Sequence, residues 1–265
     1  MTDPEVARAA AEAGAAIVRA RFGGDHRRHD KGGLDFATDV DIDAERAIIE
    51  VLQRHRPDDH VHGEESGHNP GTGDGRTWLV DPLCGTANFA AGTQAVAVNV
   101  ALTGPDPTVA AVAVPFSEEV IVAAADGAHR YTADGEAPLA PDVSSRLVDF
   151  DLDQRPMLPG FAPLDLMADA EFRSHFQPRV TSTSLSLTWV AMGRRAAYVT
   201  DGQLEGNVHF AAAVAVCLAA GCVVSDLRGR PVTPGGPATG MIAAADDPTH
   251  GLLLTMVRRL AGAVG

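Results

Sequence analysis

The sequence is poor in cysteine and in positive charge. Its three cysteines, Cys84, Cys217 and Cys222, lack the paired spacing of a disulfide framework, so we expect a reducing, cytoplasmic location. Lysine and arginine number 21 against 35 acidic residues, which gives a net charge of −14. Because nucleic-acid binding needs a basic face, we expect no nucleic-acid partner. A small anionic substrate remains compatible with this charge, since local dipoles and bound ions decide such binding.

Long uninterrupted apolar runs are also absent. The first helical stretch, residues 4–22, is interrupted by Glu5, Arg8, Glu12 and Arg19. It therefore resembles neither a signal peptide nor a membrane span, and we expect no membrane partner. Hydrophobic residues make up 45% of the 265 residues. That share is typical of a globular protein, and the length allows one large α/β core or two packed halves.

Four segments, taken together and in this order, resemble the inositol monophosphatase-like family, which includes fructose bisphosphatases and phosphoadenosine phosphatases. They are KGGLDFATDVD (31–41), GEES (63–66), WLVDPLCGTANF (78–89), and the C-terminal pair TSTSLSLTWVAMGRRAAY (181–198) and VHFAAAVAVCLAAGC (208–222). The resemblance covers nearly the whole chain. It implies an α/β (α+β) fold, the layered αβαβα sandwich of this family. We expect an N-terminal half, 1–140, with an antiparallel sheet and the GEES and DPLCGT motifs, and a C-terminal half, 141–265, that supplies His209. A homodimer is compatible with the resemblance.

The resemblance also implies a site for a first Mg²⁺ ion. Carried over by position, its ligands would be Glu64, Asp81 and the carbonyl oxygen of Leu83. Carboxylate and carbonyl oxygens are the donors that this hard cation prefers, and two or three such ions can clamp a phosphate and a water.

The attacking water and the phosphate would meet a second set of residues. By resemblance, Asp41 would orient the attacking water, with Thr86 beside it. The backbone amides of Gly85 and Thr86, at the start of an expected helix, would bind an anion. The Gly-Ser pair by which the family recognises its substrate is replaced by Thr181 and Ser182, so the substrate stays open.

The chain departs from the family where the second ion binds. Cys84 replaces an aspartate of the DPxDGT motif, and His209 replaces the aspartate of the WDxAAG motif. Val208 and Ala213 replace the tryptophan and the glycine of the latter motif. Of the three side chains that hold this ion in the family, only Asp81 is kept.

Three interpretations of the exchange are open. Cys84 can be a small buried hydrophobe, and His209 a residue that drifted after catalysis was lost. Alternatively, Asp81, Cys84 and His209 form a softer site for Zn²⁺ or Fe²⁺, which thiolate and imidazole prefer to Mg²⁺. In the third interpretation Cys84 is a nucleophile and His209 is its base.

The sequence leads us to expect the third interpretation, because random decay does not readily produce both members of a nucleophile–base pair. Asp41, Asp81 or Asp201 would orient the imidazole, and the amides of Gly85 and Thr86 would form an oxyanion hole. We therefore expect acyl (thioester) transfer, hydrolysis or cyclising release of a small metabolite, free or presented on a carrier protein, without a cofactor.

Two alternatives remain beside this expectation. One is a Mg²⁺-dependent phosphatase of inositol or sugar phosphates with a reduced metal site built on Glu64, Asp81 and Leu83. The other is a catalytically silent protein that only binds an anion.

Overall fold

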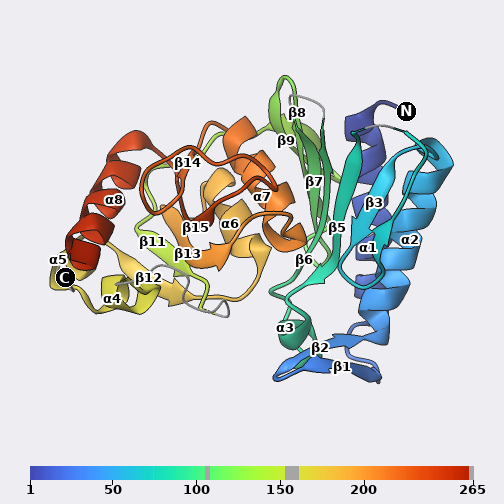
Figure 1. Cartoon of the computed structure of the whole chain (residues 1–265), viewed down its shortest axis with the longest axis horizontal. Helices are drawn as coiled ribbons and strands as arrows, with labels where there is room; N and C mark the ends of the chain where they lie inside the picture. Colours follow the sequence, from blue (N-terminus) through green and yellow to red (C-terminus); the bar gives the residue numbers. More distant parts are fainter. Residues whose placement is uncertain (74, 105–107, 153–160, 263–265) are drawn as a thin grey trace.

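The computed structural model describes residues 1–73, 75–104, 108–152 and 161–262. Its elements stack in five layers, seen edge-on in Figure 1: two helices, a large sheet, a central helical layer, a smaller sheet and outer helices. This confirms the predicted layered αβαβα sandwich.

The first layer is the pair α1 (Asp3–Arg21) and α2 (Asp39–His55). In α2, apolar residues recur every four positions at Val40, Ala44, Ile48 and Leu52, and all four are buried. This spacing puts them on one face of the helix, which packs against α1 and against the large sheet. The helix starts at Thr38, whose hydroxyl accepts a hydrogen bond from the Val40 amide.

The large sheet has eight strands in the order β10-β9-β8-β7-β6-β5-β3-β4. Its strands are β3 (His60–Gly63), β4 (Gly67–Asn69), β5 (Thr77–Cys84), β6 (Ala97–Thr103), β7 (Val109–Val114), β8 (Glu119–Ala124), β9 (Gly127–Thr132) and β10 (Gly135–Pro138). All neighbours are antiparallel except β3 and β5, which run parallel. The central strands are apolar on both faces because helices cover both faces.

The central helical layer consists of α6 (Ser184–Ala191) and α7 (Val208–Ala219). Nearly every residue of both helices is buried. A helix that is apolar all round needs apolar partners on every side, and α7 finds them in β5–β8 of the large sheet, in α6 and in β14. This packing holds the first turn of α7 beside the end of β5.

The smaller sheet has the order β12-β11-β13-β15-β14. Its strands are β11 (Leu147–Phe150), β12 (Gln177–Val180), β13 (Ala197–Gln203), β14 (Val223–Ser225) and β15 (Thr239–Ala244). The outer helices are α4 (Pro163–Ala168), α5 (Ala170–His175) and α8 (Asp247–Gly262). The described strands of the two sheets lie on either side of residue 140, but the division into two domains stays a prediction.

Two small elements flank the end of β5. The hairpin of β1 (Arg28–Gly32) and β2 (Asp35–Thr38) leads directly into α2, and α3 (Thr86–Ala90) follows β5. Figure 1 shows the hairpin and α3 together at one end of the large sheet. Within the described part of the chain, none of the helices combines the length and the apolar character needed to cross a bilayer.

Candidate active site

The end of β5 carries several of the predicted site residues. Asp81 pairs with Asn99 of β6, and the register then shifts before Cys84 pairs with Ala97. This bulge separates Asp81 from Cys84 and puts the Asp81 carboxylate in reach of the Leu83 amide, at 3.1 Å from Oδ1. Gly85 follows with φ 102°, and a Cβ there would lie 2.9 Å from the carbonyl oxygen of Ala95. Only glycine fits this turn into α3.

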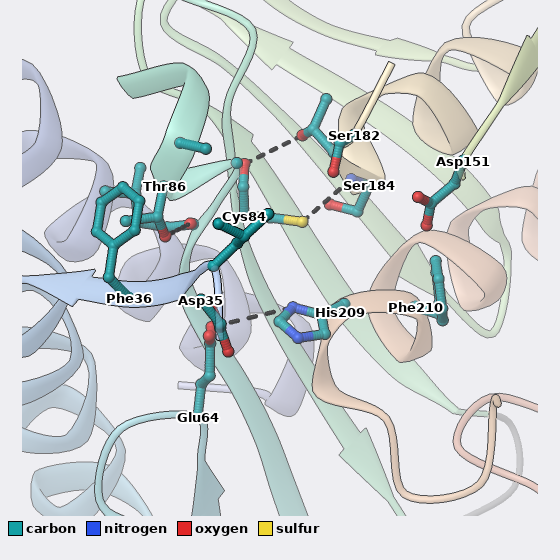
Figure 2. Close-up of a pocket in the computed structure, with 15 residues that line it drawn as sticks. Asp35, Phe36, Glu64, Cys84, Thr86, Asp151, Ser182, Ser184, His209 and Phe210 are labelled. Atoms are coloured by element: carbon teal, nitrogen blue, oxygen red, sulfur yellow. Dashed lines mark hydrogen bonds and ion pairs between the residues drawn. The ribbon is translucent and has the colours of Figure 1, made fainter. Parts of the chain in front are cut away.

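A cavity of about 540 Å³ opens at this point, a size that suits a small ligand. Figure 2 shows the side chains around it. Its lining comes from the β1–β2 hairpin, the GEES loop, the end of β5 and the starts of α6 and α7, and comprises Leu34, Asp35, Phe36, Glu64, Leu83, Cys84, Gly85, Thr86, Ala87, Asp151, Ser182, Thr183, Ser184, His209 and Phe210. The four segments that carried the family resemblance therefore meet around one cavity.

Asp41 lies beneath the cavity and is connected to it by Thr86. The Thr86 hydroxyl is 2.7 Å from Asp41 Oδ1. The other carboxylate oxygen, Oδ2, accepts hydrogen bonds from the amide (2.7 Å) and the hydroxyl (2.6 Å) of Thr38. Burial raises the pKa of Asp41, and the hydrogen bonds from Thr38 and Thr86 oppose that rise. When Thr86 donates to Asp41, the lone pairs of its hydroxyl oxygen are free to accept a hydrogen bond from a water in the cavity.

Glu64 combines burial with an incomplete set of partners. Its Oε1 accepts from Lys31 Nζ at 2.9 Å, whereas its Oε2 is buried with no hydrogen-bond partner among the described residues. Burial, followed by the negative charge of Asp81, raises the pKa of Glu64 to about 8. A cation near Oε2, in addition to Lys31, would pair with this oxygen and favour the ionised form of Glu64.

Asp81 is fully buried and is bound to His209. Its Oδ2 lies 2.7 Å from Nδ1 of His209 and 3.3 Å from Nδ2 of Asn99. Burial by itself would raise the pKa of Asp81, but the charge and hydrogen bond of His209 outweigh it, so that the pKa lies below its usual value. Burial would lower the pKa of His209, but the carboxylate of Asp81 raises it well above 6.5. The pair is an imidazolium next to a carboxylate.

Cys84 is buried, and its sulfur accepts a hydrogen bond from the Ser184 amide at 3.1 Å. Burial, followed by the charge of Asp81, raises the pKa of Cys84, although hydrogen bonds from His209 and Ser184 oppose the rise. The sulfur, an Asp81 oxygen and a His209 ring nitrogen lie within 4.8 Å of one another. The predicted proximity of the three side chains is therefore present, but the electrostatics favour a neutral thiol.

This arrangement does not suit a nucleophilic cysteine. A reactive thiol needs a lowered pKa and a neutral imidazole to accept its proton. Here the pKa of Cys84 is raised, and Nδ1 of His209 is engaged by Asp81. The start of α3 does not reverse this effect, because that helix has only five residues and desolvation of the buried sulfur dominates.

Of the three acids expected to orient His209, only Asp81 bonds to it. Asp41 bonds to Thr38 and Thr86 instead. Asp201, on β13, is buried and does not line the cavity. Thr181, of the altered substrate pair, has its hydroxyl 3.5 Å from Asp149 Oδ1, whereas Ser182 lines the cavity.

Three contacts of the site were missed by the sequence interpretation: those of Asn99, Ser184 and Lys31. Asn99 bonds to Asp81 and to the Ser184 hydroxyl, and its position as a single amide in the apolar run AVAVNVAL was a usable signal. Lys31 bonds to Glu64 and Glu65. No pattern in the sequence indicates this bridge, because it joins strand β1 to the GEES loop, 33 positions away.

The donor atoms suit a hard divalent cation at the first of the two ion positions and not at the second. Glu64, Asp81 and the Leu83 carbonyl offer oxygen ligands, and the unpaired Oε2 of Glu64 marks a place where a cation would be favourable. Beside them, the exchange of two carboxylates for Cys84 and His209 leaves sulfur and nitrogen, which match Mg²⁺ poorly.

The chain is similar to known proteins of one family. The inositol monophosphatase family model matches residues 3–261. The chain is 34% identical over 216 residues to the probable inositol 1-monophosphatase ImpA of Mycobacterium tuberculosis, covering 77% of this chain and 76% of that protein. It is 33% identical to the inositol-1-monophosphatase ImpA of Mycolicibacterium smegmatis, covering 86% and 82%. The crystal structure of the extragenic suppressor protein suhB from Bartonella henselae has a TM-score of 0.80 at 23% identity, covering 96% of this chain and 98% of that one.

Two predictions are thereby corrected. The predicted acyl transfer or cyclisation by Cys84 and His209 is wrong, because the relatives are phosphatases by name and the raised pKa of Cys84 disfavours a thiolate. The prediction that no cofactor is required is also wrong, since the inositol monophosphatases to which the chain is similar are Mg²⁺-dependent enzymes. The identity of Cys84 and His209 suggests a dyad, but the burial of Cys84 disfavours its thiolate form.

Proposed function

Because this chain belongs to the inositol monophosphatase family of phosphate-ester hydrolases, we propose that it hydrolyses small phosphate monoesters such as inositol or sugar phosphates. The observation that carries the proposal is that Glu64, Thr86 and His209 line one cavity. Asp41 is bonded to Thr86, and Asp81 is bonded to His209. A cavity of about 540 Å³ has room for a phosphorylated polyol.

Under this proposal, Thr86 and Asp41 orient the attacking water. The Thr86 hydroxyl donates a hydrogen bond to Oδ1 of Asp41, with 2.7 Å between the two oxygen atoms. The Thr86 oxygen then accepts a hydrogen bond from the water. Two bonds from Thr38 fix the Asp41 carboxylate, so that it needs no reorganisation during the reaction. The pair orients the water and draws its proton away from the oxygen that attacks phosphorus.

Glu64, Asp81 and the Leu83 carbonyl would hold a divalent cation. Such an ion, when bound, polarises a phosphoryl oxygen and offsets the negative charge of the phosphate. The imidazolium of His209 adds a positive charge at the edge of the cavity, and 38% of its side chain is exposed. The phosphate thus meets positive charge from the site even though the whole protein is acidic.

We propose a free small molecule as the substrate, bound in the cavity that Ser182, Ser184 and Asp151 help to line. A cytoplasmic location is part of the proposal, supported by three cysteines that are free thiols. The homodimer, the carrier protein and the lack of nucleic-acid and membrane partners stay predictions.

The direct test measures phosphate release from inositol 1-phosphate and from a panel of sugar phosphates, with and without Mg²⁺. We expect release that requires the ion and that is lost in Glu64→Gln. Glu12→Gln, an exposed change on α1, is the matched control and should keep full activity. A folded protein that binds inorganic phosphate but releases none from the whole panel would instead be the catalytically silent anion-binding protein.

A further inference from the structure

The second cation position of the site has an unusual set of donors. Asp81 and Cys84 come from the end of β5, and His209 comes from the first turn of α7. One donor atom of each lies within 4.8 Å of the others. Ligands that share one ion through bonds of about 2.0–2.3 Å lie roughly 3–4 Å apart, so only small side-chain movements separate this cluster from a coordinating one.

The three donors are held in place by neighbouring groups. The Cys84 sulfur is held by the Ser184 amide at 3.1 Å. The backbone of His209 is held by the side chain of Asn207, which accepts its amide hydrogen at 2.9 Å. Asp81 is fixed by the Leu83 amide at Oδ1. Metal sites typically hold their ligands with such supporting hydrogen bonds.

A fourth donor is available. Oε2 of Glu64 is buried, has no hydrogen-bond partner among the described residues and lies 3.9 Å from His209 Nδ1. Figure 2 shows the Glu64 carboxylate directed toward the His209 ring, with Cys84 bordering the same cavity. With Glu64 the site offers one sulfur, one nitrogen and two carboxylates, which equals the four ligands of a tetrahedral zinc site.

The chemistry of these donors selects the ion. Mg²⁺ takes oxygen ligands in octahedral geometry and binds thiols poorly. Zn²⁺ and Co²⁺ accept thiolate, imidazole and carboxylate together. We propose that Asp81, Cys84 and His209, with Glu64 as the fourth ligand, form a site for a thiophilic divalent cation such as Zn²⁺.

Binding of the ion has a defined proton balance. Cys84 must lose its thiol proton, and His209 must lose the proton that it shares with Asp81, so these two residues release two protons to the solvent for each ion bound, and Glu64 releases a third where it starts protonated. The ion then takes the place of the proton between His209 and Asp81. The inference goes beyond the proposed function, because it concerns which ion binds and would hold for a protein without turnover.

The test uses the purified full-length chain, stripped of metal and kept reduced with a phosphine that does not bind zinc. Titration with Co²⁺ should give one equivalent of bound ion and a near-ultraviolet sulfur-to-cobalt charge-transfer band. Titration with Zn²⁺ should then displace the band, whereas excess Mg²⁺ should not. Cys84→Ser should abolish the band and weaken Zn²⁺ binding at least about 100-fold.

The matched control is Cys222→Ser, a change of another buried cysteine outside the cluster. It should keep the band, which separates the site from any Zn²⁺ held by the histidine-rich segments 25–29 and 58–62. In Cys84→Asp/His209→Asp the preference should move from Zn²⁺ to Mg²⁺. If Co²⁺ binds without a sulfur band, or if Cys84→Ser binds Zn²⁺ as tightly as the wild type, the proposal is overturned while phosphatase activity remains possible.

Discussion

Nδ1 of His209 lies 2.7 Å from Oδ2 of Asp81, although 128 positions separate the two residues in the sequence. Asp81 has no exposed surface, and His209 covers its charge from the side of the cavity. A buried carboxylate is stable only with a partner. In the metal-free protein, His209 therefore compensates the buried negative charge of Asp81, as a bound cation would.

Loss of this pair should destabilise the metal-free protein. His209→Phe keeps a planar aromatic ring but leaves the Asp81 charge buried without its main partner, and we expect a loss of about 1–3 kcal/mol in the free energy of unfolding. Urea unfolding at pH 6 measures this change. His175→Phe, at an exposed position of α5, should change it by less than about 0.5 kcal/mol. Equal stability of the two variants would show that His209 is not the partner of Asp81.

The contribution of this pair should also depend on pH in both directions. The pKa of His209 is raised in the folded protein. The contribution of His209 to the free energy of unfolding is therefore complete below about pH 6.5 and is lost as the pH rises through the pKa of the folded state. The pKa of Asp81 is lowered in the folded protein. The contribution of Asp81 to the free energy of unfolding is therefore complete above about pH 4 and is lost as the pH falls through the pKa of the folded state. The stability difference between wild type and His209→Phe should therefore be largest from about pH 4 to 6.5. A difference that grows steadily above pH 7 would contradict the pairing.

Glu64 should make the metal-free protein sensitive to alkaline pH. Its pKa of about 8 lies above the unfolded value near 4.5, so the ionised carboxylate costs stability, and this cost is fully present above pH 8. Glu64→Gln should melt at the same temperature as wild type at pH 4 and a few degrees higher at pH 9. Thermal melts with a chelator present at both pH values test this. Glu12→Gln, at an exposed ion pair of α1, should show no such difference between the two pH values.

The Thr86 hydroxyl should be needed for turnover and not for folding. Thr86→Val keeps the shape of the side chain but cannot donate to Asp41, and we expect kcat for phosphate release to fall by about 10²–10⁴-fold with little change in KM. Thr86→Ser keeps the hydroxyl and should retain most of the rate. A loss of the same size in both variants would mean that the side chain acts through packing alone.

Gly85 should tolerate no side chain. Gly85→Ala puts a Cβ 2.9 Å from the Ala95 carbonyl oxygen at a φ of 102°, and we expect a cost of about 2–3 kcal/mol. At Gly92, φ is 78° and no heavy atom lies within 4 Å of the added Cβ, so Gly92→Ala should cost only about 1 kcal/mol. Chemical denaturation of both variants compares the costs. Similar values would mean that the contact at Ala95 relaxes freely.

Much of the architecture could be predicted from sequence because its signals are local. The buried positions Val40, Ala44, Ile48 and Leu52 repeat at the period of one helical face, and the apolar segment 210–219 is typical of a helix buried on all sides. The motif residues Glu64 and Thr86 could likewise be assigned to one cavity, because they match a family pattern in identity and order.

The contacts that set the chemistry had no local signal. Lys31 reaches Glu64 and Glu65 from the β1–β2 hairpin, and Ser184 donates its amide to Cys84 across 100 positions. Both contacts depend on how the layers pack. The predicted thiolate failed for the same reason, since the pKa of a side chain depends on solvent exposure and neighbouring charge.

By itself, the sequence determined the family, the layered fold and the exchange of two carboxylates for Cys84 and His209, because these follow from residue identity and order. Only the tertiary structure decided what the exchange does. It buries the sulfur beside the carboxylate of Asp81, binds the imidazole to that same carboxylate, and leaves Oε2 of Glu64 without a hydrogen-bond partner among the described residues. Burial and charge at contact distance raise the pKa of the thiol, and the same donors that cannot form a reactive dyad are suited to hold a metal ion.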